Sequence, residues 1–170
     1  MKVCSVLRWG HIALLLCLFA AEGKRSPAGK HGCRKGLLSQ VTQNLYGKAT
    51  GLKSSVPKDL IKNTRLLKKT TKVLFMTNCS VRDQLLSFYV KYVFSHLGAR
   101  SDKLYVITAF QVLQANMSAC HPCAPSTRLS SAVKNVKKTF LKLGEKGIHK
   151  AIHELDILLP WIQAYIQTIV

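Results

Sequence analysis

Residues 144–159 read Gly144-Glu145-Lys146-Gly147-Ile148-His149-Lys150-Ala151-Ile152-His153-Glu154-Leu155-Asp156-Ile157-Leu158-Leu159. From here to the C-terminal end, apolar side chains recur at steps of three and four, at Ile148, Ala151, Ile152, Leu155, Leu158, Leu159, Ile162, Tyr165, Ile166 and Ile169. This spacing predicts an amphipathic α-helix, which is stable only if its apolar stripe is buried against the rest of the chain. Pro160 lies inside the pattern and is expected to kink or divide the helix.

Two acids stand out in the same stretch, because the chain has only seven Asp and Glu residues. Glu154 and Asp156 are two positions apart, so on a helix their side chains point roughly 200° apart. They cannot both face the core. We therefore expect at least one of them to be available to an outside partner.

Further from this helix, residues 1–23 have the composition of a secretory signal peptide. Lys2 and Arg8 precede an apolar run from Ile12 to Ala21, and Ala21-Glu22-Gly23 offers a small-x-small cleavage site. The run is too short for a membrane span, which needs about 20 residues; a retained anchor is the alternative. We predict a secreted, extracellular protein in which residues 24–170 form one domain.

Outside the last helix, helical patterns cover approximately residues 35–54, 58–75, 81–97, 103–119 and 127–143, and no convincing strand is found. The sum is six helical segments. The predicted fold class is therefore all-α, a helical bundle around a single core.

Four cysteines remain once the expected signal peptide, with Cys4 and Cys17, is removed: Cys33, Cys79, Cys120 and Cys123. An even number in a secreted chain predicts two disulfides, with three connectivities open. Read alone, Cys120-His121-Pro122-Cys123 could also be a redox motif or half a zinc site, but no second such pair accompanies it.

No catalytic motif survives inspection. Gly47-Lys48 lacks the rest of a phosphate-binding loop, and Glu154 follows His149 and His153 in the wrong order for a zinc protease. The two histidines are expected to be partly exposed side chains rather than metal ligands. We predict that the protein is not an enzyme and that it needs no cofactor or metal.

The formal net charge of +19 predicts attraction to polyanions. In the expected helix 58–75, basic residues recur at steps of four and three and form one positive face, with one more at its edge: Lys58, Lys62, Arg65, Lys69, Lys72 and Lys68. Such a face can contact phosphate or sulfate without reading a sequence, so heparan sulfate and DNA are the expected ligands. The alternative is an ordinary solvated helix face.

Two sites match the N-glycosylation pattern, Asn78-Cys79-Ser80 and Asn116-Met117-Ser118. The pattern is short and recurs by chance. Glycans at Asn78 and Asn116 are therefore hypotheses.

Residues 145–158 resemble the C-terminal signature of the interleukin-10 family, with Glu145-Lys146-Gly147-Ile148, then Lys150-Ala151-Ile152, and then Glu154-Leu155-Asp156-Ile157-Leu158. Further similarities are Cys79 ahead of residues 84–89, Cys120-His121 ahead of residues 132–137, and the basic segment 61–69, which is similar to one strongly basic branch of that family. The resemblance implies a six-helix interleukin-10-like bundle with disulfides Cys33–Cys120 and Cys79–Cys123.

The resemblance also implies a function. Family members are cytokines that bring together two class II receptor chains and signal through Janus kinases and STAT factors. For the basic branch these are the interleukin-20 receptor alpha chain and the interleukin-10 receptor beta chain. The face formed by the first helix, the following loop and the last helix would bind the high-affinity chain through Lys53, Lys58, Asp59, Lys150, Glu154 and Asp156.

Two alternatives remain open. The chain could be a cationic antimicrobial or DNA-carrying effector that acts without a receptor. It could also form a homodimer, because interleukin-10 swaps its last two helices between subunits and the connection from Cys120 to Ser131 is long enough to allow this.

Overall fold

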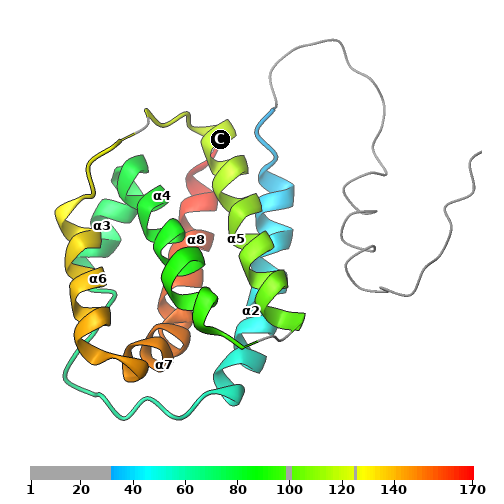
Figure 1. Cartoon of the computed structure of the whole chain (residues 1–170). Coiled ribbons are helices and arrows are strands. Elements are labelled where there is room, and N and C mark those ends of the chain that lie inside the picture. Colours follow the sequence, from blue (N-terminus) through cyan, green and yellow to red (C-terminus); the bar gives the residue numbers. More distant parts are fainter. Residues whose placement is uncertain (1–31, 99–100, 125) are drawn as a thin grey trace, which may run out of the picture. The chain divides into compact units, whose positions relative to one another are not determined.

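The computed structural model describes residues 32–98, 101–124 and 126–170, so the expected signal peptide lies outside the described residues. The α-helices are α2 (Lys35–Ser55), α3 (Lys69–Thr77), α4 (Cys79–Phe88), α5 (Ser101–Cys120), α6 (Ser131–Leu143), α7 (Glu145–His153) and α8 (Leu155–Thr168). A π-helical turn, η1 (Tyr89–Val93), and a 3-10 turn, η2 (Phe94–His96), follow α4. No strand occurs in the described ranges, and the all-α class is confirmed (Figure 1).

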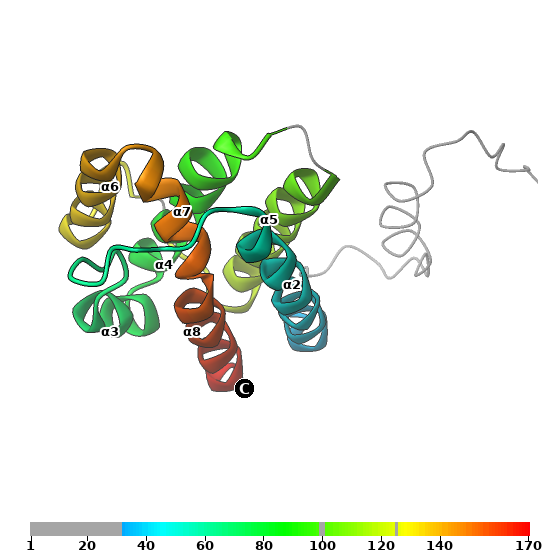
Figure 2. The same cartoon turned by 90° about the horizontal axis from the view of Figure 1, so that it is seen from below.

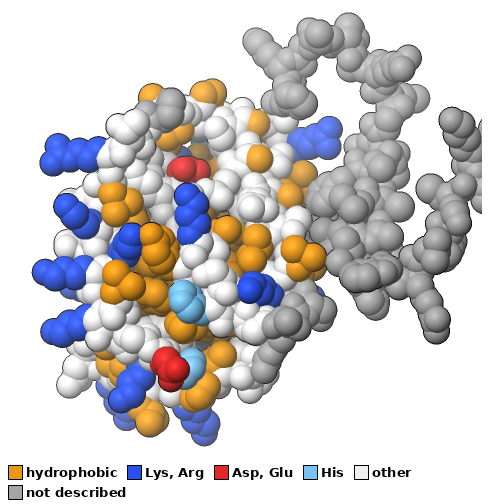
Figure 3. All heavy atoms as spheres, in the orientation of Figure 1, with side chains coloured by type: hydrophobic (Ala, Val, Ile, Leu, Met, Phe, Trp, Pro, Cys, Tyr) orange, Lys and Arg blue, Asp and Glu red, His pale blue; other side chains and the backbone are white. Residues whose placement is uncertain are grey.

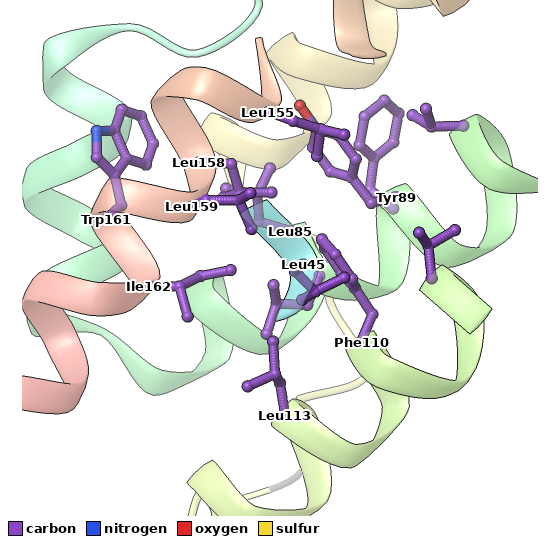
Figure 4. Close-up of a cluster of buried hydrophobic side chains, with 14 of the residues drawn as sticks. Leu45, Leu85, Tyr89, Phe110, Leu113, Leu155, Leu158, Leu159, Trp161 and Ile162 are labelled. Atoms are coloured by element: carbon purple, nitrogen blue, oxygen red, sulfur yellow. The ribbon is translucent and has the colours of Figure 1, made fainter. Parts of the chain in front are cut away.

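Helix α8 buries its apolar stripe against the rest of the bundle and leaves its opposite side, including Asp156 and Pro160, exposed. It packs against α2, α3 and α7, and Figure 2 shows it lying between α3 and α2. Leu158, Leu159 and Ile162 point into the core, where Leu45 comes from α2 and Leu85 from α4 (Figure 4). The burial of this stripe is the main reason that α8 is stable.

The π-helical turn interrupts what we expected to be one continuous helix over residues 81–97. Tyr89 and Phe94 are five positions apart, and both are fully buried. A π-turn aligns residues at that spacing, and the two ring centroids are 5.8 Å apart. Phe110 of α5 completes the cluster, with its ring centroid 4.9 Å from that of Phe94.

The expected helix over residues 58–75 is wrong in its first half. Residues 57–67, which we call the 57–67 segment, have no regular helix, and α3 begins only at Lys69. Backbone groups that a helix would use internally are bound instead by side chains of α7 and its end, including the carbonyl of Ile61 and the N–H groups of Leu66 and Leu67. Tertiary contacts therefore override the local helical pattern.

The division of the last helix was expected at Pro160 and occurs instead at Glu154. Glu154 has φ −75° and ψ 1°, which ends α7 before α8 begins at Leu155. Pro160 lies inside α8, which continues through it to Thr168. Figure 1 shows α7 crossing the base of the bundle before α8 runs back up behind α4.

Both disulfides match the pairing that the family resemblance implied. Cys33–Cys120 joins the start of α2 to the end of α5, with 4.3 Å between the Cα atoms. Cys79–Cys123 joins the start of α4 to the segment after α5, with a Cα separation of 5.7 Å.

Two glycines shape the corner between α6 and α7. Gly144 ends α6 with φ +58°, a conformation that side chains disfavour. Gly147 lies so close to α6 that a Cβ atom there would be 2.4 Å from the carbonyl oxygen of Phe140. The start of α7 is therefore held against α6 at a distance that only glycine permits.

Within residues 32–98, 101–124 and 126–170, no helix combines the length and the apolar character that a membrane span requires.

Candidate interaction surface at the base of the bundle

Lys150, on α7, is almost fully buried, with 3% of its surface exposed. Its Nζ donates to Asp59 Oδ2 at 2.9 Å and to the carbonyl of Ile61 at 2.7 Å. Both acceptors belong to the 57–67 segment, which Figure 2 shows passing across α7. Lys150 therefore binds a neighbouring segment of its own chain.

Glu154 continues the same contact one turn further on. Its Oε1 accepts the N–H of Leu66 at 3.0 Å, and its Oε2 accepts the N–H of Leu67 at 2.8 Å. Only 5% of Glu154 is exposed, and Lys150 Nζ is 3.7 Å from its Oε1. Asp59, Lys150 and Glu154 thus form one connected group of charges, which we call the α7 ion cluster; Lys150 and Glu154 are buried in it, and Asp59 is partly exposed.

We expected Lys150 and Glu154 to lie on an exposed partner-binding face. The structure instead buries both side chains. Periodicity gives only the angle between two side chains. It does not say which of the two acids faces inward.

The two carboxyl groups of the cluster have opposite pKa shifts. Burial raises the pKa of Glu154, although the N–H groups of Leu67 and Leu66 and the charge of Lys150 oppose the rise. Burial also acts to raise the pKa of Asp59. There, hydrogen bonds from Lys150 and the Ile61 N–H and the nearby positive charges outweigh it, so the pKa of Asp59 lies below its ordinary value.

His153 adds a further contact between α7 and the 57–67 segment, because its Nε2 is 2.9 Å from the carbonyl oxygen of Pro57. The neighbouring His149 is half-buried. In the part of the chain that the structure describes, no three His, Cys, Asp or Glu side chains lie close enough together to hold a metal ion.

Asp156 is the acid that faces solvent, with 61% of its side chain exposed. Lys53, in the last turn of α2, donates to both of its carboxylate oxygens at 2.6 and 2.7 Å. This bears out the expectation that at least one of the two acids points outward. Lys58 is also exposed, so Lys53, Lys58 and Asp156 form the outer surface, while the α7 ion cluster lies beneath it.

The six basic residues expected on one helical face are all exposed, but they do not form a helical line. Lys58, Lys62, Arg65 and Lys68 precede α3, and only Lys69 and Lys72 lie on it. Helix α3 packs against α6, which adds three exposed lysines, Lys134, Lys138 and Lys142. Figure 3 shows Lys and Arg side chains projecting along the left edge, where Figure 1 places these two helices.

The two possible glycosylation sites differ in their surroundings. Asn78 is exposed, and its Oδ1 caps α4 by accepting the N–H of Val81 at 3.1 Å. Asn116 is half-buried within α5, and its Nδ2 donates to the carbonyl of Val112 at 2.9 Å. Glycosylation at either position stays a prediction.

Sequence reasoning missed Arg82, which is buried between α4 and α8, and the contacts of Leu66 and Leu67 with Glu154. The adjacent pair Leu66-Leu67 gives no signal, because consecutive leucines are buried within helices as well, as Leu85-Leu86 of α4 and Leu158-Leu159 of α8 are.

Comparison with known proteins agrees with this architecture. The family model described as Interleukin 10 matches residues 76–168. Human Interleukin-26 is 42% identical over 169 residues, covering 99% of both chains. Interleukin-10 of Equus caballus is 31% identical over 101 residues, 53% of each chain, and the viral interleukin-10 homolog of Equine herpesvirus 2 is 32% identical over 96 residues, 53% of this chain and 54% of its own. With its helical bundle, two disulfides and C-terminal signature, the chain belongs to the interleukin-10 family of cytokines, which are not enzymes.

Proposed function

We propose that the protein is a secreted cytokine that brings together two class II receptor chains, the interleukin-20 receptor alpha chain and the interleukin-10 receptor beta chain. Their pairing would activate Janus kinases and STAT factors. The proposal is supported by membership of the family and by similarity to human Interleukin-26 over nearly the whole chain.

The observation that carries the proposal is the exposed pair Lys53–Asp156. It joins α2 to α8 beside the ordered 57–67 segment, where the resemblance places the high-affinity receptor chain. Asp156 is one of few acids on a strongly basic protein, and charges at such positions contribute to specific association.

The experiment compares Asp156→Lys with Asp102→Lys. Asp102 is a matched control, because it also forms a surface ion pair with a lysine of α2, Lys48, at 2.9 Å. Binding to each immobilised receptor ectodomain and STAT phosphorylation in cells that carry both chains are measured.

We expect Asp156→Lys to slow association and to weaken signalling, more so at low salt, and Asp102→Lys to leave both unchanged. Normal signalling by Asp156→Lys would place the receptor face elsewhere. Activity of the unchanged protein in cells that lack both receptor chains would favour the alternative, a cationic antimicrobial or DNA-carrying effector.

We also propose that the exposed cations of residues 58–72 bind heparan sulfate or DNA through charge contacts. Among the described residues, the ion pairs involve Lys48, Lys53 and Lys150, and none involves the six cations from Lys58 to Lys72. Their charges are therefore available to phosphate or sulfate groups, whose binding releases counterions.

Replacing Lys62, Arg65 and Lys69 by Gln tests this site, with Lys134, Lys138 and Lys142 replaced by Gln on α6 as a control of equal charge. We expect the first variant to elute from heparin and to dissociate from DNA at a lower salt concentration than the wild type. The slope of log affinity against log salt should fall by the equivalent of up to roughly three phosphate contacts. Equal losses in both variants would show that net charge, rather than this segment, determines binding.

The oligomeric state bears on receptor assembly. Within one chain, α8 packs against α2. Sedimentation of the protein, alone and with receptor ectodomains, separates a monomer from an intertwined homodimer.

A further inference from the structure

The 57–67 segment has no regular secondary structure to maintain its shape. A helix holds its own backbone through internal hydrogen bonds, whereas a segment of this kind depends on outside partners for its backbone polar groups. Here those partners are side chains of α7 and of Glu154 directly after it, which bind the segment near its start, its middle and its end.

These contacts fix the path of the backbone itself. Lys150 binds the carbonyl of Ile61, and Glu154 binds the N–H groups of Leu66 and Leu67. The Leu66 and Leu67 side chains are inserted into the core, each 2% exposed. Lys62 and Arg65 lie between these points, and their side chains are exposed. The same contacts therefore fix the Cα positions of both residues.

A buried ion cluster is an unusual means of holding two elements together, because desolvation opposes the attraction between the charges. Apolar side chains of similar size could pack as well without that penalty. What apolar side chains cannot do is accept two adjacent N–H groups and donate to a carbonyl at defined positions. The cluster is therefore better suited to defining one backbone conformation than to adding stability.

We propose that Lys150 and Glu154 are positioning residues for receptor binding, which hold the 57–67 segment in the one conformation that presents Lys58, Lys62 and Arg65 to an acidic surface of the receptor. They act through the segment and do not touch the receptor. This inference rests on the proposed receptor function, and it assigns the partner chemistry: a patch of carboxylates facing three spaced cations.

The first measurement uses the protein alone and does not depend on any receptor. Amide hydrogen exchange is followed at Leu66 and Leu67, with core amides such as Leu85 and Phe110 as internal references. Glu154→Gln keeps the shape of the side chain but has only one acceptor oxygen, so one of the two N–H groups loses its partner. We expect exchange at Leu66 or Leu67 to be faster by about tenfold or more, with core amides unchanged.

The second measurement is affinity for the receptor ectodomains. Glu154→Gln and Lys150→Met are compared with Glu145→Gln and Lys146→Met, which change the same residue types at exposed positions on the same helix. We expect the two cluster variants to bind about tenfold more weakly while the two controls bind normally. Adding salt should weaken the controls more than the cluster variants, because the segment of the variants no longer presents its cations together.

The two measurements together separate the role of the α7 ion cluster from the proposed receptor function. Wild-type exchange rates at Leu66 and Leu67 in Glu154→Gln would overturn the role of the cluster in holding the segment. Faster exchange with unchanged affinity would overturn the positioning role alone. Should the wild type and both controls fail to bind receptor, the proposed function would fail instead, and the exchange data would still report on the cluster.

A milder variant, Asp59→Asn, tests the same proposal in case Glu154→Gln unfolds the protein. Asp59→Asn removes the ion pair with Lys150 at a residue that is only partly buried and keeps an oxygen for the Ile61 N–H. We expect it to retain core protection, to exchange faster within the segment, and to lose less receptor affinity than Glu154→Gln. Affinity equal to the wild type, with faster exchange in the segment, would contradict the proposal.

Discussion

The guanidinium carbon of Arg82 lies 3.6 Å from the centroid of the Tyr165 ring. The same side chain donates from Nη1 to the carbonyl of Phe75 at 2.7 Å, and Arg82 is only 6% exposed. Tyr165 also contacts His121, whose Nδ1 is 2.7 Å from the phenol oxygen. One cation thus joins α4 to α8 and to the end of α3.

Replacing Arg82 by Lys tests the importance of this contact. Lysine keeps the charge but loses the flat surface that stacks on the ring and the forked donors. We expect Arg82→Lys to lower the free energy of unfolding by about 2 kcal/mol, measured by urea denaturation. Arg128→Lys, at an exposed position, is the control and should change stability by less than about 0.5 kcal/mol.

The two acids near the α7–α8 junction should respond very differently to substitution. Glu154→Lys places a second cation beside buried Lys150 and removes the acceptors of Leu66 and Leu67, so we expect it to lower stability by about 3–5 kcal/mol. Asp156→Asn breaks an exposed pair and should lower it by about 1 kcal/mol or less. Thermal unfolding of both variants measures the difference, and similar losses would contradict the assigned burial.

The two disulfides are expected to contribute comparable stability. Cys33–Cys120 and Cys79–Cys123 close loops with sequence separations of 87 and 44. In the chain-entropy model this difference is small, and each bridge contributes about 4 kcal/mol. Replacing either pair by Ser should therefore shift the urea midpoint by a similar amount, and a loss confined to one pair would show that native-state strain outweighs loop entropy.

Asp59 should make part of the stability dependent on pH. Because its folded pKa is lowered, its contribution is present above the ordinary Asp pKa of about 3.9 and is lost as pH falls through the folded value. The stability difference between wild type and Asp59→Asn should therefore shrink as pH falls from about 5 towards 2. Glu154 has the opposite effect on the pH dependence of stability, because its pKa is raised. Both proteins contain Glu154, so its effect largely cancels in the stability difference. Urea unfolding over this range measures the difference, and a constant difference would contradict the expectation.

Much of the fold could be predicted from sequence where local pattern and tertiary packing agree. The expected first helix, residues 35–54, matches α2, and the expected helix 103–119 matches α5 to within two residues at each end. In these helices the inward stripe, including Leu38, Leu45 and Phe110, is buried as the 3.6-residue period requires.

The parts that could not be predicted depend on partners distant in sequence. The spacing of cations from Lys58 to Lys72 fits a helix, but Lys150 and Glu154 bind the backbone that such a helix would need for itself. Nothing near Leu66 in the sequence announces a carboxylate 88 positions away. The π-turn is similarly hidden, because it depends on how Tyr89 and Phe94 pack against Phe110.

The close approach at Gly147 has a consequence for how this cytokine can vary. A side chain there would push α7 away from Phe140 of α6, and α7 carries Lys150 and leads into Glu154. The absence of a side chain at position 147 therefore sets the distance between α7 and α6, and with it the position of α7 relative to the 57–67 segment. If the proposed receptor function holds, a change at Gly147, far from the outer surface, alters receptor preference with no contact residue changed.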